Sequence, residues 1–72
     1  MKTLEDVMSG GYSTEELDRE LRELFTTDPK LIAKVERTLE TVEEEKRELF
    51  RSLLIDNYIC DLILLAHYRE GL

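Results

Sequence analysis

The sequence predicts an all-α protein. Its 72 residues include three glycines and one proline, and none of these lies between Lys30 and Glu70. Apolar residues recur at the three- and four-residue spacing of a helical face, and several helix-start signals precede them. We therefore expect a single helical domain over residues 1–72, with residues 1–12 as an N-terminal segment that can be flexible.

The N-terminal segment predicts one short helical turn. Thr3 is a suitable cap, and Asp6 follows three residues later, which is the spacing of a capping box. Ser9 and the glycine pair Gly10–Gly11 then end the turn, because paired glycines disfavour a continuing helix.

Residues 14–25 carry the clearest local helix signal. Ser13 is an N-cap candidate with Glu16 at the third helical position, and Tyr12 and Leu17 stand at the positions of a hydrophobic staple. One apolar stripe follows at i, i+4, i+7 and i+8: Leu17, Leu21, Leu24 and Phe25. This segment predicts a short amphipathic helix.

A long second helix is expected from residue 30 to residue 70. Asp28 is a good N-cap, and Pro29 suits the first helical position, where a missing N–H costs nothing. A heptad seam follows, which is typical of coiled-coil packing: Ile32, Val35, Leu39, Val42, Lys46, Leu49, Leu53, Asp56, Cys60, Ile63 and His67. Lys46 and Asp56 in this seam either set its register or mark where it is exposed.

The apolar face of this segment changes sides near residues 53–57. Two structures explain the change. Either the helix breaks near Asp56–Asn57, with Asp56 capping a third helix, or it continues and its C-terminal half is sandwiched between two partners.

The apolar run of residues 49–68 is too large for the short helix to cover, so we expect oligomerisation to complete a helical bundle. A homodimer or higher homo-oligomer is the simplest solution, and a partner of another kind is the rival. The expected interface residues are Leu49, Leu53, Leu54, Ile55, Tyr58, Ile59, Leu62, Leu65 and Ala66.

Composition excludes several partners. The formal net charge of −7 disfavours direct binding to nucleic acid or to anionic membrane. Charged and amide residues interrupt the apolar run, so it does not predict a membrane span. The N-terminus has no apolar secretory segment, and a lone cysteine fits a reducing cytoplasm.

No motif predicts catalysis. Cys60 and His67 are seven residues apart, which is about 10.5 Å along a helix and too far for a nucleophile–base pair. The Glu-x-x-His pattern of di-metal bundles is missing, as are a phosphate loop and a triad. We expect a non-enzyme with no catalytic residue, no cofactor and no metal ion.

Four acids recur in strict i+4 steps and would form a ridge on a continuous helix: Glu36, Glu40, Glu44 and Glu48. This acidic face is either an ordinary solvated surface or an imitation of nucleic-acid phosphates that blocks a basic groove.

These observations predict a small acidic helical protein–protein interaction module. We expect it to act by binding, as a regulator or inhibitor of a larger protein, in the manner of phage or plasmid inhibitors and antitoxins. The alternatives are a nucleic-acid mimic that uses the acidic face and a structural subunit of a larger assembly.

Overall fold

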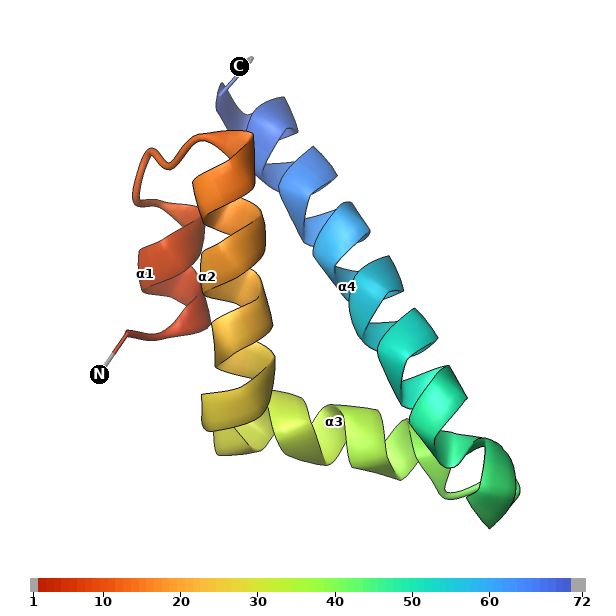
Figure 1. The fold of residues 1–72 in the computed structure, drawn as a ribbon. Helices are drawn as coiled ribbons and strands as arrows, with labels where there is room; N and C mark the ends of the chain where they lie inside the picture. Colours follow the sequence, from red (N-terminus) through yellow and green to blue (C-terminus); the bar gives the residue numbers. More distant parts are fainter. Residues whose placement is uncertain (1, 71–72) are drawn as a thin grey trace.

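The computed structural model describes residues 2–70, and these residues form helices and turns without any strand. The elements in chain order are α1 (Leu4–Met8), α2 (Thr14–Thr27), α3 (Pro29–Leu39), the 3-10 turn η1 (Glu44–Lys46) and α4 (Arg47–Glu70). In Figure 1, α2, α3 and α4 form the three sides of a triangle, and α1 lies against the outer side of α2. The all-α prediction is confirmed.

The predicted helix starts are confirmed in place. The Asp6 N–H donates to Thr3 Oγ1 at 3.2 Å, and the Thr3 N–H donates to the Asp6 carboxylate at 3.1 Å. At α2 the Glu16 N–H donates to Ser13 Oγ. The Glu16 carboxylate accepts from the Ser13 hydroxyl at 2.8 Å, in place of the backbone N–H that a full capping box would supply.

The short helix extends two residues beyond its predicted end, to Thr27. Asp28 then serves two helices. Its N–H donates to the Leu24 carbonyl and closes α2, while its side chain accepts from the Lys30 N–H at 2.9 Å and opens α3. Pro29 occupies the first turn of α3, as expected.

The single long helix expected from Lys30 is wrong. α3 ends at Leu39, the chain turns through residues 40–46, and α4 begins at Arg47. The Arg47 Nε donates to the Val42 carbonyl at 2.9 Å, which satisfies a backbone acceptor that the break leaves free. Of the two alternatives for Asp56–Asn57, the break is wrong, because α4 runs through both residues without interruption.

This turn explains the change of apolar face that the sequence shows. It folds α4 back toward α2, so the inward faces of α3 and α4 meet the same core. The core residues are Val7, Leu17, Leu21, Leu24, Phe25, Val35, Leu39, Ile59 and Ala66.

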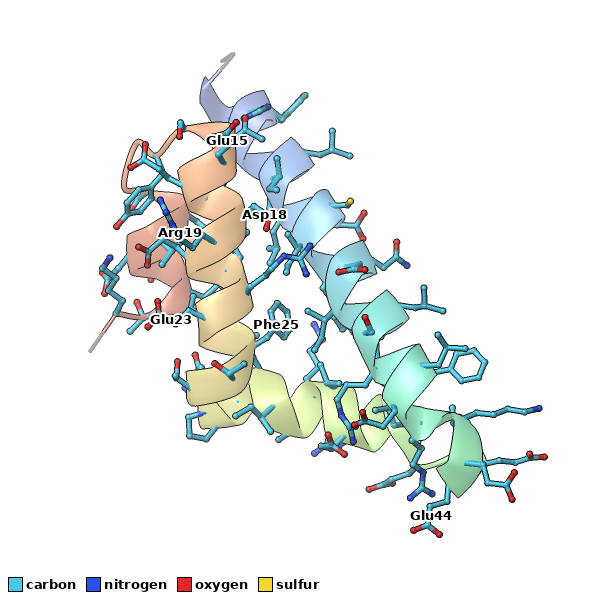
Figure 2. All side chains as sticks on the ribbon, in the orientation of Figure 1. Glu15, Asp18, Arg19, Glu23, Phe25 and Glu44 are labelled. Carbon is cyan, nitrogen blue, oxygen red and sulfur yellow. The ribbon has the colours of Figure 1, made fainter. Side chains whose placement is uncertain are left out.

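Two aromatic rings meet in the space between α2, α3 and α4. Phe25 of α2 stacks on Tyr58 of α4 with ring centroids 5.9 Å apart and planes 8° from parallel. The Lys34 ammonium of α3 lies 5.0 Å from the Tyr58 centroid, within the range of a cation–π contact. Figure 2 shows Phe25 reaching from α2 into this space.

Candidate interaction surface

α4 is the element that carries the candidate site, because it has both a buried and an exposed apolar face. Ile59 and Ala66 are buried, and Leu62 packs against the core beside them. At 100° per residue, the side chains of Leu53 and Leu64 project about 120–160° around the helix from that pair. They therefore project from the side of α4 that does not pack against the core.

We call this exposed face the outer stripe. Its residues follow the alternating steps of a helical seam, with Leu49 and Tyr68 at its edges. Leu64 is 68% exposed, Tyr68 67% and Leu49 63%, values that are high for large apolar side chains on one helix. The outer stripe consists of Leu49, Phe50, Leu53, Asn57, Cys60, Leu64 and Tyr68.

A shallow apolar groove adjoins the N-terminal end of the outer stripe. Its volume is about 320 Å³, and Phe50, Leu53 and Asn57 belong to both the groove and the stripe. Leu39 and Val42 form the wall on the side of α3. The groove exists because the chain turns at residues 40–46, and a continuous helix would not have formed it.

The predicted interface residues divide between the two faces. Leu49, Leu53 and Leu65 are exposed, whereas Ile59 and Ala66 are buried inside the chain. The remaining four pack partly buried against the core: Leu54, Ile55, Tyr58 and Leu62. The inner face of α4 thus packs against the chain's own helices.

Phe50, Leu64 and Tyr68 are exposed members of the stripe that the predicted interface leaves out. The heptad reading of the sequence placed Asp56 and Ile63 in the seam, but both are partly buried, while the neighbouring Asn57 and Leu64 are exposed. A seam shifted by one residue includes Phe50, Asn57, Leu64 and Tyr68. The apolar periodicity therefore indicates an exposed face, but which residues lie on that face depends on where the other helices pack against α4.

The acidic residues predicted to form a ridge lie on different elements. Glu36 is in α3, Glu40 caps its C-terminus, Glu44 is in η1 and Glu48 is in α4. All four are exposed, and Figure 2 places Glu44 at the corner farthest from α2. They do not form the straight line along one helix on which the phosphate-mimic hypothesis depends.

Two arginines tie α4 to the other helices. Arg51 donates from Nε to Glu36 Oε1 at 2.9 Å across the α3–α4 corner, and from Nη1 to Glu48. This hydrogen bonding from Arg51 lowers the pKa of Glu36. Arg22 of α2 bonds both Asp18 and Asp56, each at 2.7 Å. Asp56, expected as a cap or a register residue, therefore pairs with α2.

Cys60 and His67 have separate surroundings. Cys60 is an exposed free thiol. His67 Nε2 lies 3.0 Å from Thr14 Oγ1, which joins the last turn of α4 to the first turn of α2. Within residues 2–70, no three side chains of His, Cys, Asp or Glu gather in a way that could hold a metal ion.

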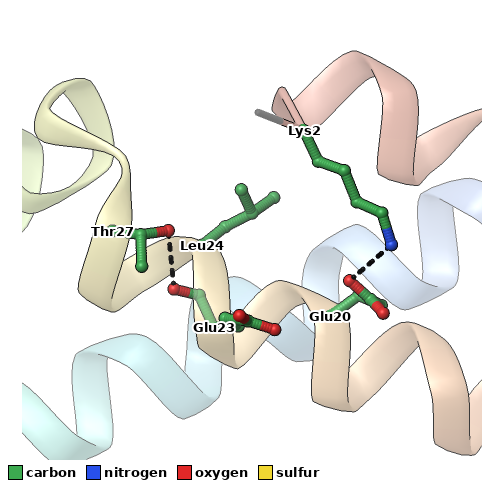
Figure 3. Close-up of a pocket in the computed structure, with 5 residues that line it drawn as sticks. All are labelled: Lys2, Glu20, Glu23, Leu24 and Thr27. Carbon is green, nitrogen blue, oxygen red and sulfur yellow. Dashed lines mark hydrogen bonds and ion pairs between the residues drawn. The ribbon is translucent and has the colours of Figure 1, made fainter.

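A second hollow lies beside the N-terminal segment (Figure 3) and has a volume of about 420 Å³. The Lys2 ammonium pairs with Glu20 at 3.2 Å, and the Thr27 hydroxyl donates to the Glu23 backbone carbonyl at 3.0 Å. The Glu23 side chain also lines the hollow.

Comparison with known proteins finds no matching family, no similar characterised protein and no similar solved structure. In the described part of the chain, no helix is long and apolar enough to span a bilayer. The outer stripe and its groove are the candidate site on geometry alone.

Proposed function

We propose that this protein is a small interaction module that acts by binding another protein chain through the outer stripe of α4. One observation supports the proposal: large apolar side chains are exposed toward both ends of one face of α4, and the opposite face packs against the core. These side chains are Leu49, Phe50 and Leu53 at one end and Leu64 and Tyr68 at the other. Groups of exposed large apolar side chains mark interaction sites on proteins. Regulation or inhibition of a larger protein is the activity that such a module would exert.

The features of the stripe suit a protein partner. Aromatic and leucine side chains supply most binding energy when they enter a partner's apolar pockets. The ionisable side chains nearest to it, such as Lys46 and Asp61, are exposed at its margins, which is the usual arrangement of an apolar centre with a polar rim.

The test is a capture experiment with the tagged wild-type chain and a Leu53→Glu/Leu64→Glu double variant. Proteins retained from a lysate of the source cells would be identified, purified and titrated against both chains. We expect the double variant to weaken binding more than about a hundredfold, because two buried hot-spot contacts are lost. Equal affinity of the two chains would contradict the proposal.

Two control variants accompany this test. Leu65→Glu places the same substitution on the same helix but off the stripe, and should leave affinity unchanged. The Glu40→Lys/Glu44→Lys variant reverses charge at the α3–α4 corner. If that variant abolishes binding while the double leucine variant does not, the acidic surface is the functional one.

A further inference from the structure

We propose that in the free protein the outer stripe is occupied by a second copy of the chain, with the two α4 helices packed antiparallel. This inference rests on the proposed function, because it names an occupant for the same surface. Three observations point to a second copy in this orientation.

The first observation is the distribution of charge. Residues 46–70 contain four basic and four acidic residues, so the whole net charge of −7 belongs to the preceding residues. The segment that contains α4 is therefore neutral overall, and two copies that approach along α4 repel each other less than two copies that approach through their acidic parts. A basic partner would instead be drawn to the acidic part of the chain.

The second observation is that the two ends of the stripe complement each other. Its C-terminal half presents Leu64, the most exposed of the large apolar side chains described. Its N-terminal end borders the apolar groove that includes Leu53 and Val42. Leu53 and Leu64 are eleven residues apart, which is about 16 Å along the helix, so Leu64 cannot reach the groove of its own chain.

An antiparallel two-fold pairing centred between residues 58 and 59 brings Leu64 of each copy to Leu53 and the groove of the other. The same operation pairs most of the stripe with itself: Leu49 faces Tyr68 of the second copy and Asn57 faces Cys60, while Phe50 faces His67. A closed two-fold contact of this kind is self-complementary, so both grooves are filled at once. In a parallel pairing each Leu64 would remain about 16 Å from the partner's groove.

The third observation concerns the acidic side chains at the rim. In a parallel seam with Asn57 and Leu64 at equivalent core positions, Asp56 of one copy lies beside Asp61 of the other, on both sides of the dimer. Like charges at facing edge positions disfavour a pairing of two helices, and the effect here is reduced because Asp56 also bonds Arg22 of its own chain. The antiparallel pairing places Asp56 and Asp61 on opposite edges of the seam and avoids this contact.

Self-association is tested by measuring the mass of the purified chain in solution from micromolar to near-millimolar concentration. The seam spans about 29 Å of helix, so we expect an interface at the small end of the stable range and a dimer that dissociates on dilution. Leu64→Glu should raise the dissociation constant more than about tenfold, whereas Leu65→Glu should leave it within about twofold. Circular dichroism of both variants reports whether the helices persist.

Cysteine cross-linking tests the orientation. Two variants, Leu53→Cys/Cys60→Ser and Leu64→Cys/Cys60→Ser, would be oxidised separately and as a mixture. The antiparallel dimer predicts a covalent dimer in the mixture and little in either sample alone. Efficient cross-linking of each variant alone would show a parallel dimer and overturn the orientation.

A chain that stays monomeric at all concentrations, or a dimer that Leu64→Glu does not weaken, would overturn the self-association. These results are distinguishable from failure of the proposed function. A monomer that still binds a larger protein through the stripe leaves that function standing, whereas a monomer without stripe-dependent binding rejects both. A target that uses the same stripe must displace the second copy, so the stripe serves one occupant at a time.

Discussion

Some residues of α4 contact α2 and α3, whereas others lie on the exposed face of the helix. Tyr58 contacts both Phe25 and Lys34 and joins three helices at the centre of the triangle. Arg51, less than two turns earlier, joins α4 to α3 through a bidentate ion pair with Glu36. Leu53 and Leu64 on the other face contribute to no part of the buried core. Each residue's role follows from the face that it occupies.

The Glu36–Arg51 pair makes stability depend on pH in a defined direction. Hydrogen bonding from Arg51 lowers the pKa of Glu36 in the folded chain below its ordinary value of 4.5. A carboxyl group with a depressed folded-state pKa stabilises the fold above the unfolded-state pKa, and this contribution is lost as the pH falls through the folded-state pKa.

We therefore predict that Glu36→Gln lowers the thermal unfolding midpoint at neutral pH and that the wild type and the variant converge below pH 4.5. The difference at neutral pH should be small, because the pair is exposed. Midpoints measured by circular dichroism from neutral to acidic pH provide the test. Glu40→Gln is the control, because Glu40 forms no ion pair within residues 2–70. A difference that persists unchanged at acidic pH would contradict the assignment.

At the scale of elements, the helix starts depend on their own local residues. Asp28 is the clearest case, since one side chain and its N–H define the end of α2 and the start of α3. Such capping contacts lie within four residues along the chain, and local sequence therefore predicts them.

Asp28→Ala should lower the free energy of unfolding by about 1 kcal/mol, the usual effect of removing an N-cap. Asp28→Asn should retain most of the stability, because an amide oxygen can accept from the same Lys30 N–H. Urea unfolding of both variants tests this prediction. An asparagine variant as unstable as the alanine variant would show that charge, and not capping, is what matters at this position.

The turn at residues 40–46 is the element that sequence reasoning missed. It contains no glycine or proline, and the bonds that stabilise it include one from Arg47 to a carbonyl five residues earlier. The change of apolar face was detected, but at residues 53–57. Periodicity records that the face changes, whereas the position of the break depends on how α3 and α4 pack together against α2.

At the scale of the whole molecule, the apolar residues of α4 lie on two faces: an inner face that packs in the core and the outer stripe, which is exposed. A domain of this size buries only about 60% of the surface that its unfolded chain exposes, so its stability is marginal. The inner face of α4 supplies much of the limited core, and the outer stripe supplies none.

This division predicts unequal effects of truncating two apolar side chains on the same helix. Ile59→Ala, inside the core, should lower the free energy of unfolding by about 3 kcal/mol. Leu64→Ala should change it by less than about 0.5 kcal/mol when the chain is dilute enough to be monomeric. Urea unfolding at low protein concentration provides the measurement. Comparable losses for the two variants would show that α4 packs in another rotational setting.

The amino-acid sequence by itself determined the helical class, the caps at Thr3, Ser13 and Asp28, and the buried stripe of α2, because each depends on residues within about two turns of one another. It also determined that residues 49–68 hold more apolar surface than the short helix can cover. Only the tertiary structure decided which part of that surface remains free. The turn at residues 40–46 sets the direction and rotation of α4, so contacts between residues distant in the chain bury Ile59 and leave Leu64 exposed.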